Sequence, residues 1–107
     1  MIRQYGEYMA ACSFIQKCEM LENNVGTVDN IKSPKELMKY ASTFGDDRKG
    51  KVVLKIKVRG SKRSGTVVLK EKRVSRTKWE VIDAEFLDEN GNSYELLVKH
   101  QQHNGIR

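Results

Sequence analysis

A run of alternating apolar and basic residues in the middle of the chain constrains the fold more than any other feature. Between residues 51 and 59, mostly basic side chains alternate with four apolar ones, Val52, Leu54, Ile56 and Val58. This two-residue period is typical of a β-strand with one buried and one exposed face. A loop that begins with Gly60 and ends with Gly65 follows, and residues 66–74 repeat the alternation. The sequence therefore predicts an antiparallel hairpin with a basic outer face.

Two more strands are predicted after the hairpin. The first, residues 79–88, has a continuous inward side only if a β-bulge falls near Ile82, and that side then holds Trp79, Val81, Ala84 and Phe86. An Asn90-Gly91 pair, a strong signal for a tight turn, precedes a last strand whose inward residues are Tyr94, Leu96 and Val98. Because Trp79 is in phase with the inward residues, we expect it to be buried in the core.

The N-terminal part of the chain has a helical period. Across residues 2–23, apolar side chains recur about every 3.6 residues, at Tyr5, Tyr8, Cys12, Ile15 and Met20. Two asparagines and Gly26 then predict the end of the helix. We therefore predict an α+β fold in which this helix packs on a four- to five-stranded antiparallel β-meander. Residues 1–99 are expected to form this single domain, and residues 100–107 a polar C-terminal tail.

The segment between the helix and the hairpin allows two interpretations. Ser33, Pro34 and Glu36 match a helix start, with an N-cap, a proline at the first helical position and a capping-box glutamate. A helical stripe then continues through Leu37, Tyr40, Ala41 and Phe44. Residues 40–44 could equally form a short edge strand. The local rules favour a helix over residues 33–44.

The sequence does not present the residues of a metal site or a catalytic site. Cys12 and Cys18 are six residues apart on the predicted helix, roughly 240° around its axis, so we expect core thiols and no disulfide. His100 and His103 lie in the polar tail and are too few for a closed metal site. We predict that Asp83, Glu85 and Asp88 lie on the outer face of a strand and in the turn that follows it. General acid–base catalysis needs a pocket, and such positions do not provide one. We expect no enzyme activity, no metal and no cofactor.

Positive charge is concentrated in the predicted hairpin. Residues 48–78 contain 13 Lys or Arg residues and a single acidic residue, Glu71, whereas the rest of the chain has seven basic and 13 acidic residues. Side chains on one face of paired strands lie about 5 Å apart. The alternation therefore predicts one interaction surface that contains Lys55, Lys57, Arg59, Lys62, Arg63, Lys70 and Lys72.

Three uses of this basic surface remain open from the residues. It could bind a partner protein or an anionic membrane surface, or the 51–78 hairpin could serve as a nucleic-acid-binding module through phosphate contacts. It could also only solubilise the chain, offset by Glu80, Asp83 and Glu85 on the next strand. The hairpin lacks the aromatic residues on which single-stranded bases usually stack. We therefore favour a protein partner, with nucleic acid as the alternative.

The sequence does not settle the compartment. Its longest nearly apolar stretch, residues 8–15, is far shorter than the roughly 20 residues that a membrane-spanning helix needs. The N-terminus also lacks the pattern of a signal peptide. A cytoplasmic protein and the soluble portion of a membrane-anchored protein are both consistent with these residues.

Several of these features together resemble the family of mitochondrial cytochrome c oxidase assembly factors and its bacterial relatives. The soluble domain of an inner-membrane presequence-translocase subunit is similar and more distant. The resemblance extends over residues 5–98 and rests on the 60–65 loop, the Lys78-Trp79-Glu80-Val81 stretch, Asn90-Gly91 and Val25-Gly26 followed by Val28. It implies a non-enzymatic interaction or assembly module and carries over no catalytic residue. It also implies a further strand after the first helix.

Overall fold

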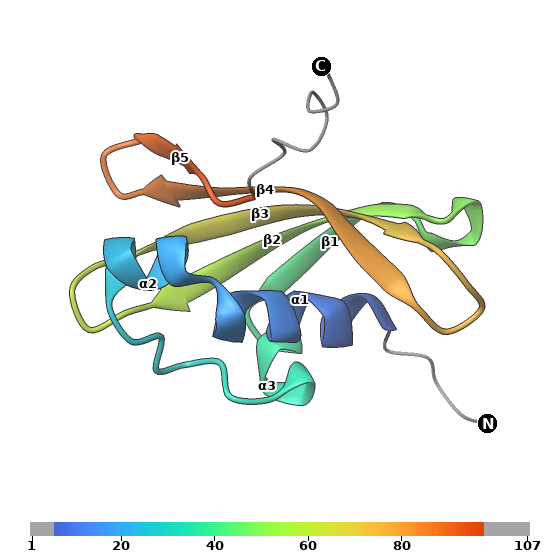
Figure 1. The fold of residues 1–107 in the computed structure, drawn as a ribbon, viewed down its shortest axis with the longest axis horizontal. Coiled ribbons are helices and arrows are strands. Elements are labelled where there is room, and N and C mark those ends of the chain that lie inside the picture. Colours follow the sequence, from blue (N-terminus) through green and yellow to red (C-terminus); the bar gives the residue numbers. More distant parts are fainter. Residues whose placement is uncertain (1–5, 98–107) are drawn as a thin grey trace, which may run out of the picture.

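The described part of the protein consists of one antiparallel sheet, three α-helices and a short 3-10 helix (Asp47–Lys49). A computed structural model describes residues 6–97. The strands follow one another in sequence order across the sheet as β1 (Ala41–Asp46), β2 (Lys51–Arg59), β3 (Ser64–Arg73), β4 (Trp79–Asp88) and β5 (Ser93–Glu95). On one side of this meander lie α1 (Gly6–Lys17), α2 (Glu19–Val25) and α3 (Pro34–Met38) (Figure 1). The predicted α+β fold is confirmed.

The first helix is shorter than predicted and is broken. A single helix over residues 2–23 was expected, but α1 ends at Lys17 and α2 begins at Glu19. Between them Cys18 is extended, with φ −85° and ψ 103°, and its thiol lies 3.9 Å from the carbonyl oxygen of Leu96. Cys12 is buried as predicted, whereas Cys18 is half-buried. The break redirects α2, whose Leu21 and Val25 are fully buried in the core.

The segment before the hairpin combines both interpretations. The Ser33 hydroxyl oxygen accepts a hydrogen bond from the Glu36 amide (3.1 Å), and Pro34 opens α3, as the capping signals predict. However, α3 ends at Met38, so the predicted helix over residues 33–44 is wrong in its second half. From Ala41 the chain pairs with β2 as an edge strand. Cross-strand hydrogen bonds outweigh the weak helical preference of these residues.

The predicted bulge in β4 is confirmed. Lys70 of β3 pairs with Asp83, but the next β3 residue, Glu71, pairs with Val81. Ile82 is therefore the extra residue, and it is 39% exposed. Because of this bulge, Val81 and Ala84 both face the helices.

Trp79 lies at the margin of the core, where it is half-buried. The guanidinium carbon of Arg73 is 5.1 Å from the centroid of its ring, and the ring packs against Gly6 at the start of α1. The prediction that Trp79 is a buried core residue is wrong. Phe86, which is completely buried, has that role.

One acidic side chain is buried among the apolar residues. Glu71 points inward, in phase with Val67 and Leu69, and is only 1% exposed. Its two carboxylate oxygens have no hydrogen-bond partner among the described residues. Burial, together with the nearby carboxylate of Glu7 on α1, raises the pKa of Glu71 to about 8.

The glycine-bounded loop between β2 and β3 fastens α2 to the sheet. The Lys62 amide donates to the carbonyl oxygen of Val25 (2.8 Å), and the Ser61 amide donates to that of Thr27 (3.0 Å). The Thr27 amide in turn donates to the Ser61 hydroxyl oxygen (3.0 Å). The chain at Gly60 lies so close to Val25 that a Cβ atom would clash with the Val25 backbone. The requirement for glycine there is thus a packing requirement between loop and helix.

Candidate interaction surface

The side of the sheet opposite the helices, here called the outer face, carries most of the predicted basic residues. In the register of the sheet, Lys51 pairs with Lys72, and Lys55 pairs with Val68. The inward residues of β2 are buried, so the residues between them project from the outer face. We define the outer basic patch as Lys51, Lys55, Lys57, Lys70 and Lys72. No helix of residues 6–97 covers this face (Figure 1).

Acidic residues form the neighbouring column on the same face. Across β3 and β4, Lys72 pairs with Glu80, and Lys70 pairs with Asp83. Glu85 pairs with Glu95 of β5 one strand further on. The outer face is therefore divided into a basic half on β2 and β3 and an acidic half on β4 and β5. The predicted position of the acids beside the lysines matches this arrangement.

An exposed aromatic residue, which was not predicted from the sequence, lies beside the outer basic patch. Phe44 of β1 pairs with Val53 and is 49% exposed. The Lys55 ammonium nitrogen lies 5.3 Å from the centroid of its ring, so the lysine side chain reaches over β1. This contact was not predicted because residues 33–44 were expected to form a helix. The strand alternative would have placed Phe44 beside the lysines.

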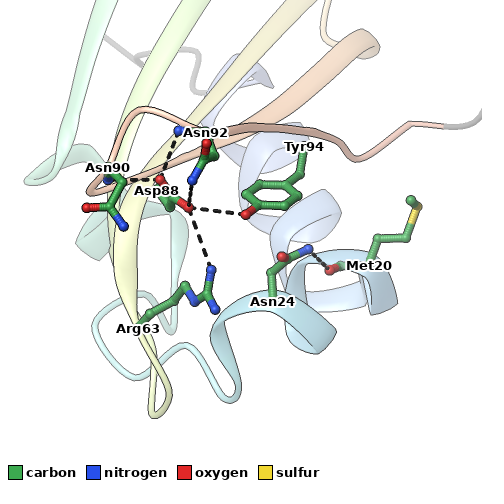
Figure 2. Close-up of polar contacts among 7 residues, drawn as sticks. All are labelled: Met20, Asn24, Arg63, Asp88, Asn90, Asn92 and Tyr94. Atoms are coloured by element: carbon green, nitrogen blue, oxygen red, sulfur yellow. Dashed lines mark hydrogen bonds and ion pairs between the residues drawn. The ribbon is translucent and has the colours of Figure 1, made fainter.

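The remaining predicted surface residues lie at the end of the sheet. Arg59 donates from Nε to Asp29 (2.9 Å), which raises the pKa of the arginine, and Arg63 lies 3.7 Å from Asp88 (Figure 2). Lys62 is exposed on the loop that holds α2. The seven predicted residues therefore do not form one continuous basic surface. Four of them, Lys55, Lys57, Lys70 and Lys72, share the outer face.

Asp88 organises the turn between β4 and β5. Its carboxylate accepts hydrogen bonds from the amides of Asn90 and Asn92 (both 2.9 Å), the side-chain amide of Asn92 (3.1 Å) and the Tyr94 hydroxyl (3.2 Å) (Figure 2). Burial acts to raise the pKa of Asp88, but these hydrogen bonds outweigh it, and the pKa lies below its usual value. The carboxylate is therefore structural and links the turn to Arg63.

We expect Asp88→Asn to destabilise the fold at neutral pH, because its amide group would turn a donor toward groups that already donate. A folded-state pKa below the unfolded value means that the ionised carboxylate stabilises the protein at neutral pH. That contribution is lost as the pH falls through the folded-state pKa. The difference between wild type and Asp88→Asn in urea midpoint should thus shrink in acid. Glu89→Gln, the same chemical change at an exposed neighbour, is the control and should have little effect.

A shallow groove lies at the end of the sheet next to the outer basic patch. It has a volume of about 730 Å³ and is lined by strand and loop residues that include Tyr40, Lys57, Leu87, Asp88 and Glu89. The groove therefore has both signs of charge beside apolar side chains.

Residues 6–97 contain neither a candidate metal-binding group nor a candidate membrane-spanning helix. Residues 6–97 contain no group of three or more His, Cys, Asp or Glu side chains that could hold a metal ion. His100 and His103, and the predicted tail at residues 100–107, lie outside the described residues. Within the described part, no helix combines the length and apolar character needed to cross a membrane.

The comparison with protein families identifies the chain. Residues 10–98 match the family model of cytochrome oxidase complex assembly protein 1. The chain belongs to this family. No curated protein and no solved structure matches the chain.

Membership of the cytochrome oxidase assembly family confirms the resemblance inferred from the turn glycines and the strand pattern. The match includes the outer basic patch, Phe44 and the loop that fastens α2. The family has an assembly role for a respiratory complex, which agrees with the interaction module predicted from sequence. The nucleic-acid alternative has no support from this comparison.

Proposed function

We propose that this chain is a non-catalytic assembly factor that binds a protein component of a respiratory oxidase complex through its outer face. The observation that carries the proposal is the outer basic patch beside the exposed Phe44, on a sheet face that no described helix covers. Lysine side chains next to an aromatic ring suit a partner surface that combines carboxylates with apolar side chains. The family assignment supports a respiratory complex as the place of action.

The acidic half of the outer face supports a protein partner over nucleic acid. Glu80 and Asp83 lie directly beside Lys72 and Lys70 in the sheet register. A phosphate backbone that followed the basic strands would run close to these carboxylates, which repel it. A protein surface can present both signs of charge and match both halves of the face.

Reversing the charge of the outer basic patch tests the proposal. In cells that lack the native gene, we expect the variant Lys55→Glu/Lys57→Glu/Lys70→Glu to restore little assembled oxidase, because its patch would repel an acidic partner. The amount of assembled complex is measured on native gels. The matched control, Lys17→Glu/Lys32→Glu/Lys35→Glu, makes the same charge change at exposed lysines of the helical layer and should restore assembly. Equal restoration by both variants would contradict the proposal.

A further inference from the structure

The two edges of the sheet differ in how well they are protected. At one edge, β5 is only three residues long and carries Glu95. At the other edge, β1 has six residues, none of which is Lys, Arg or Pro, and its middle residues are exposed. Short length, lysines, prolines and covering elements are the usual means by which proteins block an edge strand. The edge formed by β1 lacks the first three.

The hydrogen-bond pattern shows which backbone groups point away from the sheet. The Lys57 amide donates to the carbonyl oxygen of Tyr40 (3.0 Å). In an antiparallel pair every second residue bonds its partner, so Ser42 and Phe44, like Tyr40, direct their backbone groups toward β2. The N–H and C=O groups of Ala41 and Thr43 therefore point to the free edge. Beyond them Gly45 has φ +101° and bends the strand, which limits the available edge to residues 41–44.

The charge around this edge is strongly positive. Residues 39–59 contain seven basic and two acidic residues. The ammonium group of Lys55 already extends over Phe44, so it lies above β1, the strand nearest the edge. A second copy of the chain would bring another positive edge to the same place, whereas an acidic segment would be attracted.

We propose that the free edge of β1 binds an extended acidic segment of a partner protein, which adds to the sheet as a sixth strand. Backbone groups of Ala41 and Thr43 supply the hydrogen bonds of this strand addition. Carboxylates on the outer side of the added strand meet Lys55 beside Phe44, and the apolar side chains that alternate with them lie on its inner side. This inference rests on the proposed function and names the kind of partner segment that the outer face receives.

A synthetic probe tests the edge directly. The probe is an acetylated eight-residue peptide of alternating Glu and Val, added to ¹⁵N-labelled protein. We expect it to slow hydrogen exchange of the Ala41 and Thr43 amides by at least roughly tenfold. The same peptide with N-methyl groups on every residue has no N–H donor on either edge, so it cannot form the ladder and should have no such effect. Unchanged exchange with the unmodified peptide, or equal protection by a Lys-Val peptide, would overturn the proposal, as would self-association of the protein through this edge.

Two substitutions at one position provide the protein-side control. Thr43→Pro removes the outward N–H, and proline is tolerated at an edge when its N–H would face solvent. Thr43→Val keeps the N–H, and both variants lose the 2.9 Å hydrogen bond between the Thr43 and Tyr8 hydroxyl groups. We expect Thr43→Pro to weaken probe binding by at least roughly tenfold and Thr43→Val to bind like wild type. If Thr43→Pro does not fold, the N-methylated peptide decides the matter.

The cellular assay separates this inference from the proposed function. Loss of oxidase assembly on charge reversal but full assembly with Thr43→Pro would leave the proposed function intact and refute the strand addition. Full assembly with the charge-reversed variant would refute the proposed function itself.

Discussion

The stability of this protein should fall as the pH rises from about 5 to 8, in contrast to the usual behaviour of a protein with carboxylates. Glu71 is buried without a hydrogen-bond partner among the described residues, and its pKa is raised from 4.5 to about 8. Below pH 4.5 the carboxyl group is neutral in both the folded and the unfolded protein. Between these values the unfolded chain loses the proton while the folded chain keeps it, so the free energy of unfolding decreases.

The size of the effect follows from the shift in pKa. Each unit of pKa corresponds to about 1.4 kcal/mol, so the loss approaches about 5 kcal/mol as the pH rises through 8, and it levels off once the folded protein is also deprotonated. Urea denaturation followed by circular dichroism at several pH values measures it. Glu71→Gln removes the ionisable group, so its stability should vary much less with pH. Glu7→Gln removes only the neighbouring charge. Most of the pH dependence of stability should remain in this variant, because burial is the main cause of the raised pKa of Glu71. A wild-type urea midpoint that is the same at pH 5 and pH 8 would contradict this account.

The second large effect that we expect is a loss of stability in Gly60→Ala, which adds a methyl group at this position. The added Cβ would clash with the carbonyl group of Val25, and backbone atoms cannot move aside as a flexible side chain can. Relief would separate the 60–65 loop from α2 and weaken the hydrogen bond from the Lys62 amide to Val25. We expect Gly60→Ala to lower the free energy of unfolding by about 3 kcal/mol, at the upper end of overpacking effects.

Gly91→Ala is the matched control for this substitution. Gly91 has φ +88°, but a Cβ there meets nothing within 4 Å, so only backbone strain of about 1 kcal/mol is expected. Hydrogen exchange of the Thr27 amide gives a local readout, because this amide is bonded to Ser61 of the loop. It should exchange faster in Gly60→Ala and unchanged in Gly91→Ala. Similar stability losses in the two variants would show that the contact with α2 is unimportant.

Period-two alternation was enough to predict the central strands, and even the bulge at Ile82, because burial of one face dictates these patterns. The periodicity of the sequence did not predict the features that depend on tertiary contacts. The break at Cys18 has no glycine or proline to announce it, and the pairing of Ala41 with β2 depends on a segment 15 residues away. Trp79 has the right phase but lies too near the end of its strand to be covered.

The candidate site was predictable in part for the same reason. Alternation assigns Lys55, Lys57 and Lys70 to one face without any knowledge of the fold. The pairing of Arg59 with Asp29 joins residues 30 apart and has no local signal. The inward position of Glu71 was in fact readable from its phase with Leu69. A charged residue at such a position indicates a buried ionisable group.

Because of its bulge, β4 could be one residue shorter and still direct the same side chains inward. If Ile82 were deleted, every pairing between β3 and β4 would remain in register. The inward residues of β4 would then occupy strictly alternating positions: Trp79, Val81, Ala84 and Phe86. A one-residue deletion usually moves all later side chains to the opposite face. Here it would leave the inward side of β4 in frame and remove only an exposed isoleucine and a local twist. A chain that is one residue shorter at this point can therefore keep the same core.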